Sequence, residues 1–305
     1  MGNEFVGSAG HSAEYFGDTR EYWYAPDFLA LLSQRWRLHD VQSTLDIGCG
    51  VGHWGRLLAS RMSAGARVVG IDREQAWVEA ARDRAAAMGL HERFEYRQGT
   101  VESLPFEADS FDLVTCQTVL IHVHDPRTAL QEMIRVTRRG GLVAVAEPNN
   151  VARALLSPDV LTDPIDEVVA LVQFQLTCER GKEALGEGNN SIGELVPRLF
   201  HSLGLEHVQV CQNDKAAPLI PPYDDPEGRA NVDELRSFSE REFWIWNRSD
   251  TQRYFVAGGG DKTSFERFWS LALAQQKRSA IAIDQGTLVS AGGNVVYLVS
   301  GRKPT

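Results

Sequence analysis

A glycine-rich segment preceded by an acidic residue is the first feature of this chain with the residue types for ligand chemistry. Residues 45–52 read LDIGCGVG and stand between a strand-like run and a helix-like run. Glycines at such a junction let a ligand approach the backbone, and the following helix offers N–H groups without intrahelical partners. Asp72 ends the next strand-like run, where its carboxylate can accept hydrogen bonds from both ribose hydroxyls. The pattern therefore predicts a site for a nucleoside or a dinucleotide.

The spacing of the glycines distinguishes these two ligand classes. A dinucleotide-binding turn would have glycines at positions 48, 50 and 53, but the residue at position 53 is His53. Asp46 precedes the turn, and its negative charge favours a sulfonium or ammonium group and disfavours a pyrophosphate. We therefore expect S-adenosylmethionine, and the alternative of a nicotinamide-dependent dehydrogenase is disfavoured.

Further segments extend the pattern over residues 40–150. They read VVGIDRE, GTVESLPFEADSFDLVTCQTVLIHVHDP and RVTRRGGLVAVAEP, in that order after LDIGCGVG. Together they resemble the class I S-adenosylmethionine-dependent methyltransferases, within which the likeness is to the small-molecule group that includes the ubiquinone/menaquinone-biosynthesis enzymes. The resemblance implies methyl transfer to the oxygen, nitrogen or carbon of a small acceptor. A non-catalytic protein that binds the same nucleoside for regulation is the open alternative.

The resemblance also implies which residues bind the cofactor. Gly48 and Gly50 approach its methionine part, Asp72 holds the ribose, and Gln117 faces the cofactor from the end of the fourth strand. Residues 100–101 flank the adenine. The full predicted set is Asp46, Gly48, Cys49, Gly50, Asp72, Arg73, Thr100, Val101, Glu102 and Gln117.

Thr100 departs from the family pattern, which usually has Asp at this position to accept a hydrogen bond from the adenine amine. A threonine hydroxyl also accepts, but without charge assistance, a difference of roughly 1–2 kcal/mol. Glu102, two residues later, is a candidate substitute for the missing carboxylate.

His122 is the candidate catalytic residue. The family often places a histidine here, near the transferred methyl group, and a histidine titrates close enough to neutrality to deprotonate an acceptor hydroxyl. The alternative is a histidine that only orders the loop after the fourth strand. Metal ligation by His122, His124 and Asp125 would need a further ligand cluster, and the sequence shows none. We therefore predict no metal.

Aromatic residues outside the cofactor region are candidates for binding the acceptor. Tyr22 and Tyr24 precede Pro26, and Trp244 falls in an expected late helix. Aromatic walls suit an apolar or aromatic acceptor, although such residues also build cores. The glycines at 258–260 are consistent with either a lid hinge or an ordinary turn between helices.

The elements that position these residues follow an alternating pattern of strands and helices, which predicts an α/β fold with a doubly wound, seven-stranded, mostly parallel sheet of Rossmann-like type and a helical cap. We expect an N-terminal helical arm at 1–40, the cofactor-binding core at 41–150, and a helical insertion at 151–190. Residues 191–305 should complete the sheet, with a second helical insertion at about 213–285. The expected strands are 43–48, 67–72, 93–99, 111–117, 142–147, 205–212 and 294–301, and the late helices are 232–247 and 262–283.

Composition limits the partners and the compartment. The net charge of −10 argues against nucleic acid and anionic membranes as partners, because proteins that bind them usually present a basic face. The 4 cysteines are widely spaced and indicate reduced thiols. No apolar run is long enough to span a membrane, and the first residues lack the features of a secretory signal. We expect a cytoplasmic protein, and the pattern does not predict an oligomeric state.

Overall fold

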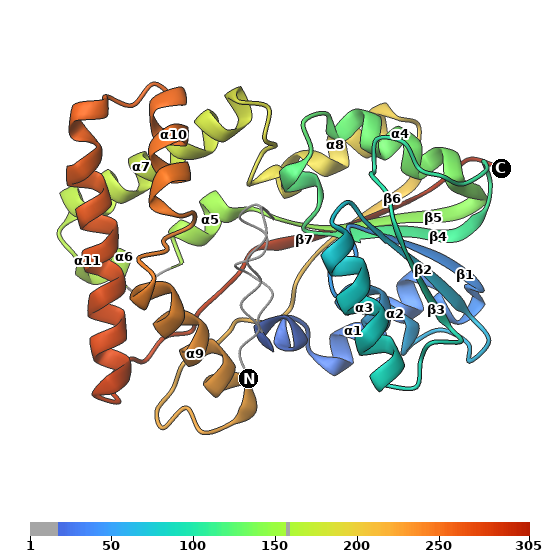
Figure 1. Cartoon of the computed structure of the whole chain (residues 1–305), viewed down its shortest axis with the longest axis horizontal. Coiled ribbons are helices and arrows are strands. Elements are labelled where there is room, and N and C mark those ends of the chain that lie inside the picture. Colours follow the sequence, from blue (N-terminus) through green and yellow to red (C-terminus); the bar gives the residue numbers. More distant parts are fainter. Residues whose placement is uncertain (1–17, 157–158) are drawn as a thin grey trace. The chain divides into compact units, whose positions relative to one another are not determined.

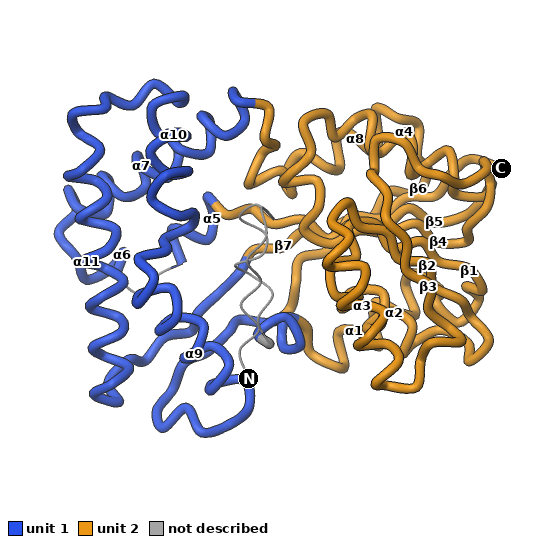
Figure 2. Tube along the Cα trace, viewed as in Figure 1, with its two compact units in different colours: residues 1–23, 151–185, 215–294 blue, residues 24–150, 186–214, 295–305 orange. Residues whose placement is uncertain are grey.

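The computed structural model describes residues 18–156 and 159–305. It divides the chain into two compact units (Figure 2). The sheet unit comprises residues 24–150, 186–214 and 295–305, and the helical unit comprises residues 1–23, 151–185 and 215–294. Residues 24–40 of the predicted N-terminal arm, including α1 (Pro26–Trp36), belong to the sheet unit. The first residues, considered above for a targeting signal, lie outside the described part of the chain.

The sheet unit contains the seven-stranded sheet that the sequence predicts (Figure 1). The strand order is β3-β2-β1-β4-β5-β7-β6, and β7 pairs antiparallel with both β5 and β6. The order reverses between β1 and β4, so ligands of such a fold bind at the carboxyl ends of these two strands. The strands are β1 (Ser43–Ile47), β2 (Arg67–Asp72), β3 (Phe94–Gln98), β4 (Phe111–Gln117), β5 (Thr137–Pro148), β6 (Glu206–Gln212) and β7 (Val296–Arg302).

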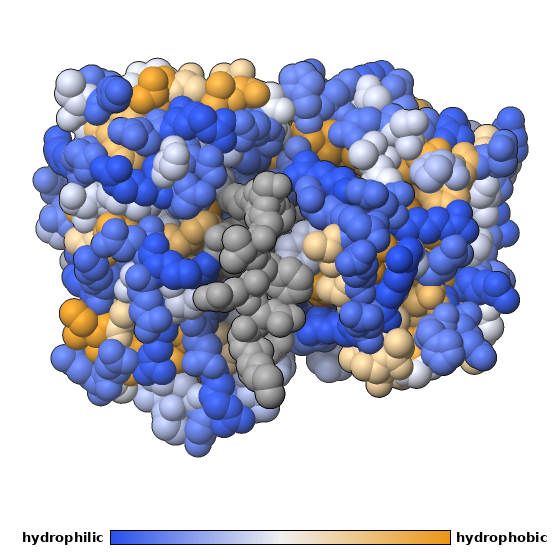
Figure 3. Space-filling view, viewed as in Figure 1, coloured by the Kyte–Doolittle hydropathy of each residue, from blue (hydrophilic) through white to orange (hydrophobic). Residues whose placement is uncertain are grey.

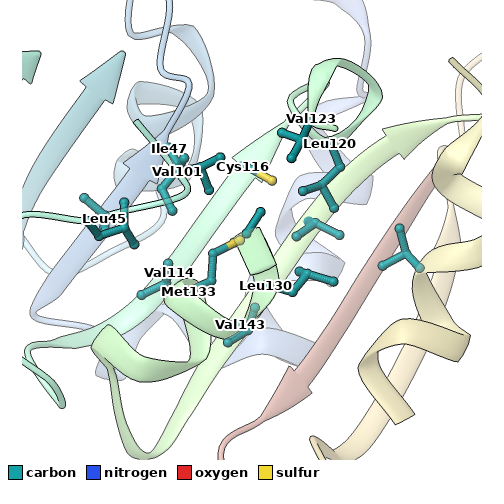
Figure 4. Close-up of a cluster of buried hydrophobic side chains, with 14 of the residues drawn as sticks. Leu45, Ile47, Val101, Val114, Cys116, Leu120, Val123, Leu130, Met133 and Val143 are labelled. Carbon is teal, nitrogen blue, oxygen red and sulfur yellow. The ribbon is translucent and has the colours of Figure 1, made fainter. Parts of the chain in front are cut away.

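Helices cover both faces of this sheet. The central strands β1 and β4 are buried except for the half-buried Ser43, as expected for parallel strands between two helical layers. On one face Leu45, Val114 and Val143 pack with Leu130 and Met133 of α4 in the main hydrophobic cluster (Figure 4). The other face packs against α2 and α3. The helices of this unit are α1, α2 (His53–Ala59), α3 (Gln75–Ala87), α4 (Pro126–Val136) and α8 (Val196–Ser202), with short 3-10 turns η3 (Leu38–Asp40), η4 (Leu120–His122) and η5 (Ile192–Leu195).

The fifth strand begins earlier than the sequence predicts. The expected strand begins at residue 142, but α4 ends at Val136 and β5 begins at Thr137. The backbone of Gly140 and Gly141 exchanges hydrogen bonds with Lys303, just beyond β7. These residues therefore extend the ladder between β5 and the end of the chain, a pairing over a long sequence separation that local patterns do not reveal.

The helical unit packs around aromatic side chains. Phe174 of α7 contacts Phe255, Phe265 and Trp244. Its elements are η2 (Asp18–Tyr22), α5 (Asn150–Ala154, whose first residue belongs to the sheet unit), α6 (Asp159–Thr162), α7 (Ile165–Ala184), α9 (Pro226–Glu240), α10 (Arg248–Ala257), η6 (Lys262–Ser264) and α11 (Phe265–Asp284).

The predicted helix at 232–247 is wrong in its second half. Helix α9 begins at Pro226, where the Asp225 side chain caps its first turn, and it ends at Glu240. Glu242 has a φ of 49°, a left-handed conformation that interrupts a helix. Phe243, Trp244 and Trp246 therefore lie in the connection between α9 and α10, not in a helix.

Figure 3 shows hydrophilic residues over most of the visible face of each unit, with hydrophobic residues in small scattered areas. Within the described residues, no helix combines the length and the apolar character that a bilayer crossing requires.

Candidate functional site

The glycine turn joins β1 to α2 and requires glycine for two separate reasons. Gly48, Gly50 and Gly52 have φ values of 59°, 50° and 76°, which side-chain-bearing residues rarely adopt. The space around the turn is also occupied. A Cβ on Gly48 would stand 2.4 Å from Cγ2 of Val119, and one on Gly52 would stand 2.3 Å from the hydroxyl oxygen of Tyr96. The backbone of this turn is therefore fixed between two neighbouring side chains.

Asp72 ties the end of β2 to the glycine turn. Its Oδ2 accepts a hydrogen bond from the backbone N–H of Gly50 at 2.9 Å, and its Oδ1 accepts one from Glu74 at 3.0 Å. Burial raises the pKa of Asp72, and these two backbone hydrogen bonds lower it. Each carboxylate oxygen can accept a further hydrogen bond. Asp72 therefore keeps acceptor capacity beside the turn, as the predicted ribose contact requires.

Asp46 lies beneath the same turn and is only 1% exposed. Its Oδ2 accepts a hydrogen bond from the N–H of Gly55 at 2.9 Å, whereas Oδ1 has no hydrogen-bond partner among the described residues. Burial, with a smaller contribution from the neighbouring charge of Asp72, raises the pKa of Asp46 to about 7. Two buried carboxyl groups thus flank the turn. In their ionised forms they attract a cationic ligand and repel a pyrophosphate.

Gln117 and Tyr24 meet at the carboxyl end of β4. The side-chain amide of Gln117 donates a hydrogen bond to the Tyr24 hydroxyl at 2.9 Å, and both residues are buried. The Tyr24 ring also contacts Trp54, with 5.6 Å between the ring centroids. The structure therefore brings one predicted acceptor-binding residue together with one predicted cofactor-binding residue.

The other two predicted acceptor-binding residues belong to the helical unit. Tyr22 lies in η2, with the ammonium group of Lys215 5.8 Å from its ring centroid. Trp244 is half-buried and stacks on Phe174, with 4.8 Å between the centroids. Trp244 thus packs against the aromatic core of its own unit, which was the alternative interpretation of these residues.

The predicted adenine-binding residues form a loop after β3. The N–H of Gly99 donates to the backbone carbonyl of Asp72 at 3.0 Å, so this loop begins next to the ribose candidate. Thr100 is exposed and forms an isolated bridge with Ser103. Val101 is buried, whereas Glu102 is exposed and so points to water in this structure. Arg73 is also exposed, with its Nε 3.4 Å from a carboxylate oxygen of Glu74.

His122 ends the short turn η4, directly after β4. It is half-buried, and its backbone N–H donates to the carbonyl of Val119 at 2.9 Å. A Cβ on Gly188 would stand 2.4 Å from the carbonyl oxygen of Ile121, so residues 186–190 pack closely against this turn. His124 is exposed, and Asp125 caps the first turn of α4 instead of joining the histidines. Among the described residues, no group of three or more His, Cys, Asp or Glu side chains is arranged to hold a metal ion.

Glu147, near the end of β5, is a further charged residue at this edge of the sheet, and the sequence analysis did not single it out. Its side chain is fully buried, and Oε1 accepts hydrogen bonds from the N–H groups of Val119 and Leu120, both at 2.9 Å. The sequence feature that could have identified Glu147 is an acidic residue within the otherwise apolar run LVAVAEP. An acid in a strand that is buried on both faces needs a partner, which that run alone does not identify.

The region that holds these residues matches a known protein family. Residues 45–145, from the start of the glycine segment to within β5, match the family described as "Methyltransferase domain". This part of the chain is a methyltransferase domain. The match spans the glycine turn, Asp72, the loop after β3, Gln117 and His122.

Individual relatives share the methyltransferase domain. The uncharacterized methyltransferase YcgJ of Bacillus subtilis is 33% identical over 130 residues, which are 43% of this chain and 49% of YcgJ. The ubiquinone/menaquinone biosynthesis C-methyltransferase UbiE of Xylella fastidiosa (strain M12) is 33% identical over 149 residues, 46% of this chain and 59% of that protein. The chain therefore spans only about half the length of these curated relatives.

Solved structures extend the likeness to the fold. The crystal structure of YcgJ has a TM-score of 0.52 and 20% identity, covering 92% of this chain and all of that chain. The crystal structure of the [4+2]-cyclase SpnF has a TM-score of 0.50 and 18% identity, covering 92% of this chain and 81% of that one. At these identities the likeness shows the fold alone.

Together the matches confirm the recognition of an S-adenosylmethionine-dependent methyltransferase domain and its doubly wound, Rossmann-like fold. The cofactor class, S-adenosylmethionine, is confirmed with the family. The roles of the individual site residues remain predictions, as does the acceptor.

Proposed function

We propose that this chain transfers the methyl group of S-adenosylmethionine to a small-molecule acceptor. The observation that carries the proposal is a methyltransferase domain whose glycine turn lies between two buried carboxyl groups, Asp46 and Asp72. When bound, S-adenosylmethionine would supply a methyl group on a positively charged sulfur. The acceptor atom would bond to the methyl carbon on the side opposite the sulfur as the carbon–sulfur bond breaks, and S-adenosylhomocysteine would leave. The protein then needs mainly to hold the acceptor in line at about 3–3.5 Å and to exclude water.

The residues divide this work as follows. The glycine turn binds the methionine part through its backbone, and the free acceptor capacity of Asp72 binds the ribose hydroxyls. Gln117 and Tyr24 line the carboxyl end of β4 and orient the ligands there. His122 removes a proton from the acceptor where the acceptor is a poor nucleophile. The acceptor is a small apolar or aromatic molecule, and we place the protein in the cytoplasm.

The test is ligand binding followed by turnover with the full chain. Calorimetry should show binding of S-adenosylmethionine and S-adenosylhomocysteine by the wild type and no binding by Gly50→Val, because a branched side chain cannot adopt the backbone of this turn. Deuterated S-adenosylmethionine and a panel of hydroxyl, amine and acidic-carbon acceptors should then give S-adenosylhomocysteine and a labelled product.

Two results would contradict the proposal in different ways. If the folded wild type does not bind S-adenosylmethionine, the proposed cofactor site is wrong. Binding without turnover on any acceptor would favour the non-catalytic regulatory alternative. The likeness to a structure named as a cyclase shows why turnover has to be measured, since one fold carries several reactions.

A further inference from the structure

The carboxylate of Glu147 bonds to the loop that carries His122. Its Oε1 accepts the N–H groups of Val119 and Leu120, each at 2.9 Å, and the thiol of Cys116 lies 3.6 Å from the same oxygen. The Oε2 atom has no hydrogen-bond partner among the described residues. Burying an acid in this way is costly unless its hydrogen bonds compensate. The bonds to the loop are therefore the reason that an acid is tolerated here.

The backbone N–H groups that Glu147 binds need a hydrogen-bond partner from outside the loop. The N–H groups of Val119 and Leu120 stand at the start of the turn η4, where a helical turn offers its own first N–H groups no partner. Thr118 precedes them with a φ of 54°, a conformation that residues other than glycine rarely adopt. Without Glu147, two buried or half-buried N–H groups would lose their partner beside a strained residue.

The segment held in this way connects the glycine turn with His122. At one end, Cγ2 of Val119 occupies the space beside Gly48. At the other end, His122 completes η4. Leu120, which follows Val119, and Val123, which follows His122, belong to the hydrophobic cluster and lie near Cys116 (Figure 4). A shift of this segment would therefore move both the Val119 side chain, which packs against the glycine turn, and His122, the candidate general base.

We propose that Glu147 is a positioning residue that fixes residues 118–122, so that Val119 closes on the glycine turn and His122 stays at the carboxyl end of β4. The first part of this proposal, that Glu147 fixes the segment, is independent of the proposed function. The second part, that the fixed segment serves the cofactor site, rests on the proposed function.

The chain offers a matched control in Asp112, at the opposite end of β4. Its Oδ2 accepts the backbone N–H groups of Gln42 at 2.7 Å and Ser43 at 3.0 Å, and the residue is 8% exposed. Asp112 is thus a second buried carboxylate that holds two N–H groups, and its Oδ1 also pairs with Nη1 of Arg138 at 2.7 Å. It stands at the opposite end of β4 from the segment at 118–122. Replacing it tests the loss of such a carboxylate without touching the segment at 118–122.

The first measurement is hydrogen–deuterium exchange of the full chain without added ligand. In Glu147→Ala the amides of residues 118–122 should exchange at least tenfold faster than in the wild type. Glu147→Gln, which keeps an acceptor oxygen, should remain near the wild type, and Asp112→Ala should leave this segment unchanged. Unchanged exchange in folded Glu147→Ala, or equal loosening by Asp112→Ala, would overturn the proposal. If Glu147→Ala does not fold, Glu147→Asp gives the same test with a shortened side chain.

The second measurement is the Kd for S-adenosylmethionine. We expect at least fivefold weaker binding by Glu147→Ala, recovery by Glu147→Gln, and the wild-type value for Asp112→Ala. A loosened segment with an unchanged Kd would show that Glu147 does not serve the site. Failure of the wild type to bind would instead reject the proposed function, while the exchange experiment would still report whether Glu147 holds the segment.

Discussion

Asp46 illustrates at the scale of one residue how a buried acid can select a cationic ligand. Because burial raises its pKa to about 7, a large fraction of Asp46 is protonated in the free protein near neutral pH. A cation bound at the adjacent turn favours the ionised form, so binding should lower this pKa and release protons. We predict that S-adenosylmethionine binds more tightly as the pH rises from 6 to 8, by at most about tenfold per pH unit.

Calorimetry in buffers of different ionisation enthalpy would measure this proton release directly. The pH dependence should be steeper for S-adenosylmethionine than for S-adenosylhomocysteine, which lacks the sulfonium charge. Asp46→Asn should flatten it while keeping an acceptor for the N–H of Gly55. Affinity that falls with rising pH, or an Asn variant with the wild-type slope, would show that Asp46 does not sense the ligand charge.

His122 makes a second prediction at the residue scale. As a general base it should support turnover, and His122→Ala should lower kcat by roughly 10²–10⁴ with nearly unchanged cofactor affinity. The variant should also lose an ionisation near neutrality from its pH–rate profile. A variant that keeps that ionisation would remove His122 from the reaction. A joint fall of affinity, thermal stability and activity would instead assign it to ordering the loop.

At the scale of elements, the sequence predicts the strands well because each one combines a short apolar run with a polar or glycine boundary. The runs ending at Asp72 and Gln117 match β2 and β4 to the residue. The connection after α9 could not be predicted in the same way. Its aromatic residues continue the apolar pattern of a helix, and the interruption at Glu242 depends on backbone conformation. Likewise the hydrogen bond that Gln117 donates to Tyr24 and the one that Glu147 accepts from Val119 join distant parts of the sequence.

The close approach of α7 and α10 is an element-scale feature that supports a stability prediction. A Cβ on Gly181 would stand 1.7 Å from the carbonyl oxygen of Tyr254, and one on Gly258 would stand 1.9 Å from that of Thr177. Gly258 directly follows α10 and serves this helix contact, a role distinct from the hinge considered from the sequence. Because backbone atoms cannot move aside cheaply, we predict that Gly181→Ala lowers the free energy of unfolding by about 1–3 kcal/mol.

Denaturant unfolding would measure this loss. Gly65→Ala is the matched control, since a Cβ there meets nothing within 4 Å and Gly65 has no left-handed φ. Equal stability of Gly181→Ala and Gly65→Ala would mean that the two helices are further apart than the structure shows.

At the scale of the whole molecule, buried carboxyl groups make stability depend on pH in a direction opposite to that of ordinary acid denaturation. Burial raises the pKa values of both Asp46 and Glu147 to about 7, above those of the unfolded chain. At these two positions the folded protein therefore holds more protons than the unfolded chain between about pH 4 and 7, and their contribution to stability falls as the pH rises through this window. We predict a lower melting temperature at pH 8 than at pH 5.5.

The contribution of Glu147 can be isolated because Glu147→Gln carries no titrating group at that position. Differences between the variant and the wild type cancel the other ionisable groups, including the histidines. The variant should gain stability relative to the wild type as the pH rises from 5.5 to 8, and Asp46→Asn should behave in the same way. Thermal unfolding at several pH values checks this. A difference that is constant across the range would mean that the Glu147 carboxyl is already ionised at pH 5.5, with its two loop N–H groups offsetting burial far more strongly than its raised pKa implies.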